Sequence, residues 1–566
     1  MFVIAGCVVL LVFLLAACGR GQSAAGTSGG ADRSNFNALG TFPLVKEKET
    51  INVMAAQVRP ELNYDTNLMT LFYENKTNVH VNWSVLPIDQ FRDRVNLALA
   101  SNEPIDCIIS GGHLNTRFQM IEVMKLANEG LILPLQDLIE TDSIYFKKNL
   151  DETPGWREVI THPNGGIYNF PSSNDCFHCQ YYGKMWINKE FMRNLNLQTP
   201  TTVDEFRNML IAFRDRDANG NGDPNDEIPL LGANDNFSAY VSTYLMNAFV
   251  YDDGENRLYL DNGRVTASFM QPEFRDGLRY LNRLYNDRLI TRDSFTMDRG
   301  VRAQVNSTKY ESVIGAMPNS THGNLGTRPA GQPVRWIDYD LIPPLKGPNG
   351  LQITRYHYYD KFQTDRPAGF IPSTSKNPAL IVRWLDWLVS YDGTIMLMFG
   401  EKGVGWRDAD PGATGPDGRP ALYQNITIPT TDPNYGNIIW DQYFPYYRSA
   451  DFRLSQQAPD DMWASDGTGA ERVLFQRTLS YYAPYGIARE NLIPPLYYAE
   501  EEVSDVATLT TNINTYVQES IAKFVVGDLN VETDWNQYLN ELRNLGADRY
   551  LQIIQRTYDN SAFARR

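Results

Sequence analysis

Histidine and cysteine are scarce in this sequence, and their scarcity excludes several kinds of catalytic site. The 566 residues include six histidines and five cysteines, and they contain neither a His-Glu-x-x-His zinc motif nor a Gly-x-x-x-x-Gly-Lys phosphate loop. One Gly-x-Ser-x-Gly match at residues 26–30 lies in a Gly- and Ser-rich stretch, whereas a nucleophilic serine needs a strained turn between a strand and a helix. We therefore predict that the protein has no catalytic residues. An exported glycosidase with two carboxylates is the alternative, because 67 acidic residues always allow such a pair.

Positive charge is also in short supply. The chain has 51 Lys and Arg against 67 Asp and Glu, which gives a net charge of −16. Phosphate groups are bound by basic patches, so this balance argues against a nucleic acid or an anionic lipid surface as the main partner. Aromatic residues, in contrast, make up 12% of the chain. Tyr and Trp fill large cores, and they are also the side chains that stack on sugars.

The first 17 residues form an uncharged apolar run that ends in Leu15-Ala16-Ala17 and is followed by Cys18. An apolar stretch of this length, then small residues and a cysteine, is typical of a bacterial lipoprotein signal peptide. We predict a signal peptide at residues 1–17, lipidation of Cys18, and a location on the extracellular face of the cell membrane, where acyl chains such as palmitate hold the protein. Residues 18–45 are then predicted to be the lipidated cysteine and a flexible tether.

Three cysteines, Cys107, Cys176 and Cys179, remain in the predicted mature chain. An odd number leaves at least one thiol unpaired. The segment Cys176-Phe177-His178-Cys179 is compatible with a zinc half-site, a redox pair, a local disulfide or two packed thiols.

Three strand patterns alternate with two helical patterns near the start of the predicted folded part. Residues 51–55, 79–83 and 105–109 have strand character, and residues 65–75 and 88–100 between them have helical spacing. This order predicts an α/β fold with a parallel sheet and right-handed crossovers. Ligands of such sheets bind at the carboxyl ends of the strands.

A capping box at residues 202–205 begins a predicted helix that leads into an acidic loop. The loop has oxygen-bearing side chains at alternate positions, glycines for the turn and carboxylates at its end, which is what a calcium ion with its oxygen ligands requires. The predicted ligands of this structural calcium ion are Asp215, Asp217, Asn219, Asn221, Asp223, Asp226 and Glu227. Two registers are open, one that starts at Asp215 and one that starts at Asp217.

Several further motifs are spread over the chain. They are Gly-Gly-Ile-Tyr-Asn-Phe-Pro at 165–171, Met-Trp-Ile-Asn-Lys-Glu at 185–190, Leu-Asn-Leu-Gln-Thr-Pro-Thr-Thr-Val-Asp-Glu-Phe at 195–206, Asp-Glu-Ile-Pro at 226–229, Trp-Leu-Asp-Trp-Leu at 384–388 and Gly-Glu-Lys-Gly-Val-Gly-Trp at 400–406. Together they resemble extracellular solute-binding lipoproteins of carbohydrate ABC importers, family 1, in particular the LipO-like subgroup related to calcium-containing alginate-oligosaccharide binding proteins. The acidic loop here has one residue more between Asn221 and Asp226 than the family pattern.

The resemblance implies an α/β, bilobed, periplasmic-binding-protein-like fold with two parallel-sheet lobes joined by a hinge. Residues 46–170 and about 373–400 would form lobe 1, residues 171–372 with the calcium loop would form lobe 2, and residues 401–566 would be shared between the lobes. The crossovers would lie near residues 168–185 and 367–373.

The resemblance also implies a membrane-tethered receptor, expected to be a monomer, that closes on an oligosaccharide and delivers it to the permease subunits of an ABC transporter. Aromatic faces would stack on the sugar rings, and polar side chains would bond to the hydroxyl groups. The candidate ligand-binding residues are the aromatic residues Trp336, Tyr356, Tyr358, Tyr359 and Trp406 and the polar residues Gln57, Arg59, Ser110 and Asp175. A sugar-sensing or adhesion lipoprotein without a transport role is the alternative.

Overall fold

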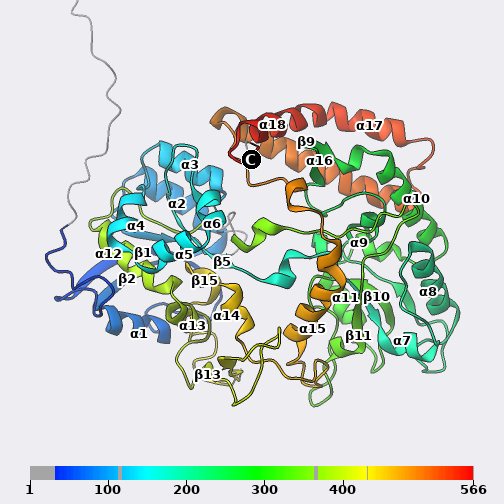
Figure 1. Cartoon of the computed structure of the whole chain (residues 1–566), viewed down its shortest axis with the longest axis horizontal. Coiled ribbons are helices and arrows are strands. Elements are labelled where there is room, and N and C mark those ends of the chain that lie inside the picture. The colour runs from blue at the N-terminus through cyan, green and yellow to red at the C-terminus, as the bar shows by residue number, and fades with distance from the viewer. Residues whose placement is uncertain (1–31, 112–115, 117, 363–366, 430, 565–566) are drawn as a thin grey trace, which may run out of the picture.

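The chain forms two lobes that lie side by side (Figure 1). The computed structural model describes residues 32–111, 116, 118–362, 367–429 and 431–564. The predicted signal peptide, Cys18 and the serine motif at 26–30 lie outside the described residues. Each lobe has its own sheet with helices packed around it, which confirms the predicted bilobed α/β fold. Among the described residues, no helix is both long enough and apolar enough to cross a membrane.

The first lobe is built on a five-stranded sheet with the order β2-β1-β3-β12-β4. Its strands are β1 (Glu49–Gln57), β2 (Val79–Pro87), β3 (Cys107–Ile109), β4 (Phe170–Pro171) and β12 (Pro367–Phe370). β1 runs parallel to β2 and β3, so the predicted β-α-β-α-β unit is confirmed. β12 is antiparallel to β3 and to β4. The sheet is therefore mixed rather than wholly parallel, because β4 leads out of this lobe and β12 leads back into it.

Helices cover both faces of this sheet, which explains its apolar strands. Alternate residues of β1 point to opposite faces: Val53 and Ala55 are buried on one, Met54 and Ala56 on the other. α2 and α3 supply the second of these cores, and the remaining helices supply the first. The helices are α1 (Leu68–Thr77), α2 (Phe91–Ala100), α3 (Met120–Asn128), α4 (Gln136–Asp142), α5 (Tyr145–Glu152), α6 (Pro154–Ile160), α12 (Pro378–Asp386) and α13 (Tyr391–Phe399).

The second lobe is built on a four-stranded sheet with the order β11-β6-β10-β7. Its strands are β6 (Met185–Asn188), β7 (Ile228–Leu230), β10 (Ile314–Pro318) and β11 (Tyr339–Ile342). Only the β7–β10 pair is parallel, since β6 runs antiparallel to both β10 and β11. The expectation of a parallel sheet therefore holds in this lobe only for β7 and β10, because β6 enters from the hinge in the opposite direction.

The helices of the second lobe include three from the end of the chain, which pack into the same core (Figure 1). The predicted capping box of α8 is present: the Thr202 hydroxyl accepts the amide of Glu205 at 3.2 Å. The helices are α7 (Lys189–Asn194), α8 (Val203–Asp215), α9 (Val241–Leu245), α10 (Pro272–Asn286), α11 (Arg299–Val305), α15 (Ala470–Arg477), α16 (Glu500–Val526), α17 (Trp535–Asn544) and α18 (Ala547–Asn560).

Short strands and turns connect the lobes and decorate their edges. β5 (Ser173–Asn174) follows β4 and pairs in parallel with β15 (Tyr447–Arg448), which leads to α14 (Ala450–Leu454). Two hairpins complete the set: β8 (Leu258–Asp261) with β9 (Arg264–Ala267), and β13 (Trp406–Asp408) with β14 (Tyr423–Asn425).

Two predicted boundaries need correction. Phe36, Leu44 and Val45 are buried in the first-lobe core, so the later part of the predicted tether belongs to the folded lobe. β12, expected at the second crossover, is a strand of the first sheet, so this crossing ends before Pro367. Both segments are apolar and short, and their packing partners lie far away in the sequence.

Candidate ligand-binding cleft and metal loop

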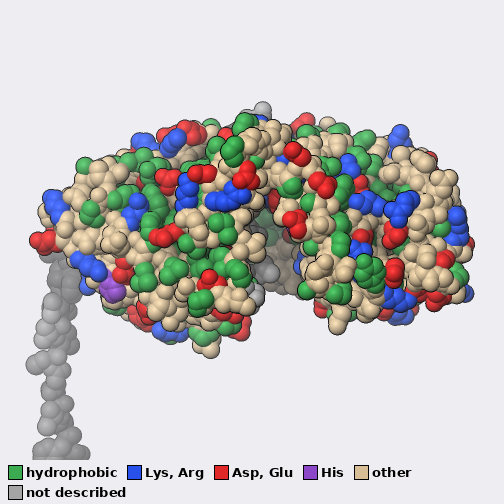
Figure 2. Space-filling view, turned by 90° about the horizontal axis from the view of Figure 1, so that it is seen from below, with side chains coloured by type: hydrophobic (Ala, Val, Ile, Leu, Met, Phe, Trp, Pro, Cys, Tyr) green, Lys and Arg blue, Asp and Glu red, His purple; other side chains and the backbone are tan. Residues whose placement is uncertain are grey.

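A cavity of about 750 Å³ lies between the two lobes. The space-filling view shows the surface hollowed between the two halves of the molecule (Figure 2). The walls come from the start of α3, the crossing segments, the loop before α9, and the chain around residues 492–498. A volume of this size is within the range of small-ligand sites. The lining residues discussed below are Cys176, Cys179, Tyr182, Phe237, Asp253, Glu255, Arg299, Ser320, Arg355, His357, Tyr359 and Lys361.

The segment that returns from the second lobe presents alternate residues to the cleft. Arg355, His357 and Tyr359 line it. Tyr356 stacks on Tyr181 instead, with ring centroids 5.0 Å apart. Tyr358 lies under the Arg489 guanidinium, 4.0 Å from its ring centroid. Tyr358 and Tyr359 begin the 3-10 helix Tyr358–Phe362, in which successive side chains point in different directions, so Tyr359 faces the cleft and Tyr358 does not.

Arg355 is a buried cation in the cleft wall. Its side chain is 1% exposed and donates to Glu255 Oε2 at 2.6 Å. Its guanidinium also lies 4.3 Å from the centroid of the Phe237 ring, and thus covers one face of that ring. Phe237 itself is half-buried and lines the cleft. Tyr182, which also lines the cleft, meets the same ring edge to face, with ring centroids 5.4 Å apart. These two contacts hold the Phe237 ring in the cleft wall.

The other cations of the cleft are also paired with carboxylates. Arg299 donates to Asp235 at 2.9 Å. Lys361 lies 3.8 Å from Asp175, which accepts a hydrogen bond from Gln180 at 3.2 Å. The three cations of the wall are thus neutralised by carboxylates. A further lining carboxylate, Asp253, accepts the backbone amides of Glu255 and Arg257 at 2.9 and 2.7 Å.

The structure brings together four of the nine candidate ligand-binding residues. Asp175, Tyr356, Tyr358 and Tyr359 lie on the crossing segments next to the cleft, and Tyr359 is the one that lines it.

Three other candidates lie at the strand ends of the first sheet, where their side chains bond to the backbone. Gln57 donates to the carbonyls of Arg59 and Leu62 at 2.6 and 2.7 Å. Arg59 donates to the Ile439 carbonyl at 2.9 Å. The buried Ser110 hydroxyl donates to the Pro367 carbonyl.

The two tryptophans lie elsewhere. Trp336 is 6% exposed in the second-lobe core, against His322 and Trp463. Trp406 begins the β13–β14 hairpin and donates from Nε1 to the Gly400 carbonyl at 3.0 Å.

Sequence reasoning did not identify Phe237, Glu255 or Arg355. Their signal is spatial, since Glu255 and Arg355 are 100 residues apart.

Cys176 and Cys179 form a disulfide, which selects one of the four alternatives. Both residues line the cleft; Cys179 lies within the short 3-10 helix Phe177–Gln180, and Cys176 directly precedes it. His178 is buried between them, with Nε2 3.3 Å from Glu471 Oε2. Cys107 is a free thiol in the first-lobe core, and burial raises its pKa. The disulfide therefore fixes the cleft-facing turn of the first crossing.

Lys184 anchors the same turn from the second lobe. Its side chain is fully buried, and its ammonium donates to the carbonyl of His178 at 2.7 Å and to that of Tyr181. Burial, with a further contribution from the charge of Arg355, lowers the pKa of Lys184 to about 7. A buried cation thus ties the turn to the start of β6.

The predicted metal loop joins α8 to β7. Asp215 is the last residue of α8, and its carboxylate pairs with Arg214 at 2.7 Å. It therefore lies before the turn of the loop. The carboxylate of Asp217, in contrast, accepts the amides of Asn221 and Gly222 at 3.1 and 2.9 Å. Gly222 has φ +90°, a conformation that glycine adopts without strain.

The end of the loop has carboxylate oxygens directed inward. Glu227 Oε1 accepts the amides of Ala218 and Asn219 at 2.6 and 3.2 Å. Glu227 Oε2 is buried, and no hydrogen-bond donor among the described residues contacts it. Burial raises the pKa of Glu227. A buried oxygen of this kind, among further carboxylate and amide oxygens, fits a hard cation such as calcium.

The class of the protein follows from the two lobes, the cleft and a family match. Residues 47–395 match the family model of the bacterial extracellular solute-binding protein, so the chain belongs to this family.

Individual relatives match over most of the chain. The fructooligosaccharide ABC transporter substrate-binding protein FusA of Streptococcus pneumoniae is 26% identical, over 96% of this chain and 95% of its own. Lipoprotein LipO of Bacillus subtilis is 23% identical over 63% of this chain and 67% of its own.

Solved structures show the same fold. A FusA EF-hand mutant in complex with fructo-nystose superposes with a TM-score of 0.68 at 23% identity, over 90% of this chain and 99% of that one. The alginate-binding protein AlgQ2 without calcium ion superposes with a TM-score of 0.62 at 20% identity, over 91% and 99%.

Lys184 predicts a specific pH dependence of stability. Its pKa is about 7 in the folded protein and about 10.4 in an unfolded chain, so the unfolded chain binds more protons between these values. The free energy of unfolding should therefore rise with pH in this window. Relative to Lys184→Met, the wild type should gain about 2 kcal/mol between pH 7 and 9 in urea unfolding. Parallel pH profiles of the two proteins would contradict the assignment, and Lys523→Met, on an exposed helix face, is the control.

Proposed function

We propose that this protein is a lipid-anchored receptor that binds an uncharged oligosaccharide between its lobes and delivers it to the permease subunits of an ABC transporter. The observation that carries the proposal is the cleft wall formed by Phe237, Arg355 and Glu255. It offers a rigid aromatic face beside polar groups whose charges are already paired. Sugars present both apolar C–H faces and hydroxyl groups, which are the two features such a wall binds.

The relatives support the same ligand class. FusA is a fructooligosaccharide-binding protein by name, and it matches this chain over nearly its full length. We propose that the protein binds its ligand without a chemical step and that it is a monomer. Release of reducing ends from oligosaccharides by the purified protein would contradict the proposal that it only binds its ligand.

Replacing Phe237 by Ala should weaken oligosaccharide binding about tenfold, because one aromatic stacking surface is lost. Titration calorimetry with fructooligosaccharides of increasing length and with an acidic oligosaccharide of matched length would measure this effect. Tyr435→Ala is the matched control, since Tyr435 is 45% exposed and does not line the cleft. A preference for the acidic sugar, or unchanged affinity in Phe237→Ala, would overturn the proposed site.

The anchor is proposed from the sequence of residues 1–18 and from the lipoprotein relative LipO. Acyl chains on Cys18 should keep the protein in the membrane fraction. The change Cys18→Ala should shift it to the medium or to an uncleaved precursor, as followed by fractionation and by the mass of the N-terminal peptide. A wild-type protein without an acylated Cys18 would contradict this assignment.

We further propose that residues 217–227 hold a structural calcium ion, in the register that starts at Asp217. Asp217, Asn219, Asn221, Asp223, Asp226 and Glu227 would supply the oxygens, whereas Asp215 is engaged by Arg214. The residues that line the cleft include none from this loop, so the ion would support the lobe and not the ligand.

Removal of calcium by a chelator should therefore lower the melting temperature, because an ion bound only by the folded state stabilises that state. Asp217→Ala should reproduce this loss and make the protein insensitive to chelator. Asp215→Ala, a matched change just outside the turn, should keep the calcium response. If chelator leaves the melting temperature of the wild type unchanged, the calcium proposal fails.

A further inference from the structure

One carboxylate of the metal loop is contacted by a lysine from another part of the chain. The ammonium of Lys309 forms an ion pair with Asp226 Oδ2, which also accepts the side-chain amide of Asn221 at 2.8 Å. Asp226 Oδ1 accepts the side-chain amide of Asn219 at 3.1 Å. Burial would raise the pKa of Asp226, but the hydrogen bonds from Lys309 and Asn221 hold it below its usual value. Both oxygens of this predicted calcium ligand are thus occupied by positively polarised N–H groups.

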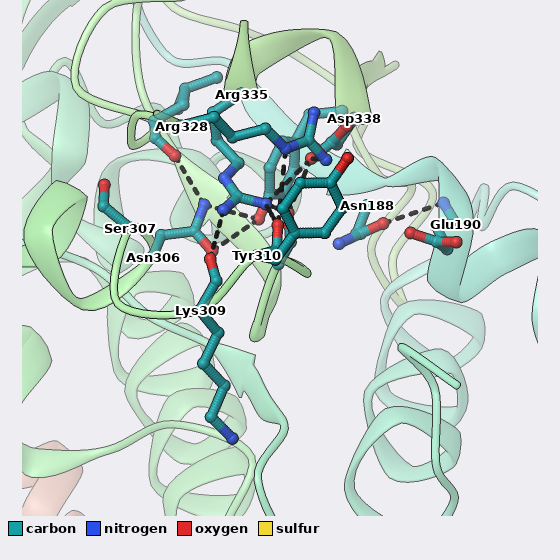
Figure 3. Close-up of polar contacts among 12 residues, drawn as sticks. Asn188, Glu190, Asn306, Ser307, Lys309, Tyr310, Arg328, Arg335 and Asp338 are labelled. Carbon is teal, nitrogen blue, oxygen red and sulfur yellow. Dashed lines mark hydrogen bonds and ion pairs between the residues drawn. The ribbon is translucent and has the colours of Figure 1, made fainter. Parts of the chain in front are cut away.

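A buried arginine, Arg335, holds the backbone of Lys309 in place. The side chain of Lys309 extends away from Arg335 and Asp338 (Figure 3). The Arg335 side chain has no exposed surface and donates to the carbonyls of Lys309 and Tyr310 at 2.7 and 2.8 Å. Asp338 lies 3.3 Å from Arg335 and accepts a hydrogen bond from Arg328 at 2.8 Å. The position of Lys309 therefore follows from the fold and not from its ion pair alone.

The sheet explains why two distant segments meet. The metal loop leads directly into β7, and the segment with Lys309 leads directly into β10. β7 and β10 are parallel neighbours, with Ile228 opposite Ile314. Their amino ends therefore lie at one edge, with the loop on one strand and Lys309 on the other.

We propose that Lys309 is a tethered competitor of the metal: its ammonium holds Asp226 when calcium is scarce, and calcium displaces it. The inference rests on the calcium site proposed above. A calcium ion on Asp226 would bring two positive charges close to the ammonium, and like charges at this separation repel. Lys309 has a flexible stem and is 45% exposed, so it can turn into solvent. Calcium also needs the amide oxygens of Asn219 and Asn221, whose nitrogens now face Asp226.

The decisive variant is Lys309→Met, which has an unbranched side chain one atom shorter than that of Lys and removes the charge. Its calcium dissociation constant, measured by titration calorimetry on the full mature chain, should fall about three- to tenfold relative to the wild type. Its melting temperature in chelator should also fall, by about 1 to 2 °C, because the ion pair to the loop is lost. Lys309→Arg, which keeps the charge, should stay close to the wild type in both measurements.

The matched control is Lys523→Met, which removes an exposed ion pair to Glu519 in α16, where N and O are 3.4 Å apart. It should leave calcium affinity unchanged. Calcium affinity that is unchanged or weaker in Lys309→Met would overturn the inference, since Lys309 would then be neutral toward the bound ion or would support it. No calcium binding by the wild type would instead overturn the proposed calcium site itself, so the two failures are distinguishable.

Discussion

The parallel pairing of β7 with β10 is the constraint on which the second lobe depends. At their amino ends these strands hold the acidic loop and Lys309. At their carboxyl ends they lead to Phe237 and Ser320, which line the cleft. A strand rises about 3.3 Å per residue, so three to five residues separate the two edges by roughly 10 to 17 Å. Two hydrogen-bonded strands therefore connect the loop edge to the edge that lines the cleft, although none of the described lining residues belongs to the loop.

The crossing segments connect the two lobes and also line the cleft between them. The disulfide Cys176–Cys179 and the ammonium of Lys184 fix the first crossing. Arg355, on the second crossing, pairs with Glu255 of the second lobe. Lys184 and Arg355 are buried cations, which need partners. Lys184 therefore ties the first crossing to a backbone carbonyl, and Arg355 ties the second crossing to a carboxylate. These contacts hold the two crossing segments in place where they line the cleft.

Local patterns were enough to predict the elements whose structure is decided locally. The strands β1, β2 and β3 and the helices between them follow from apolar spacing, and the cap of α8 follows from Thr202 and Glu205. β12 was not predictable in this way. Its four residues, Pro-Ala-Gly-Phe, have no alternation, and its place in the sheet is decided by the free edge of β3.

The candidate site shows the same limit. Tyr359 lies in a polar segment flanked by Gly and Pro, the pattern on which it is predicted to be a ligand-binding residue, and its side chain lines the cleft. Trp336 has polar neighbours in the sequence but packs into the core against Trp463, a contact 127 residues away that only the fold creates. The surface with Phe237 and Arg355 depends on three loops meeting, so no local pattern reports it.

The charge of the cleft connects the composition of the chain to its ligand. A net charge of −16 opposes the approach of polyanions, but a local group of cations can reverse that effect. In this cleft the cations Arg299, Arg355 and Lys361 each have a carboxylate beside them. An anionic sugar would have to compete with these carboxylates for each cation. A neutral sugar needs only hydrogen-bond donors and acceptors in fixed positions, which paired charges provide. Long-range field and local pairing therefore favour the same uncharged ligand.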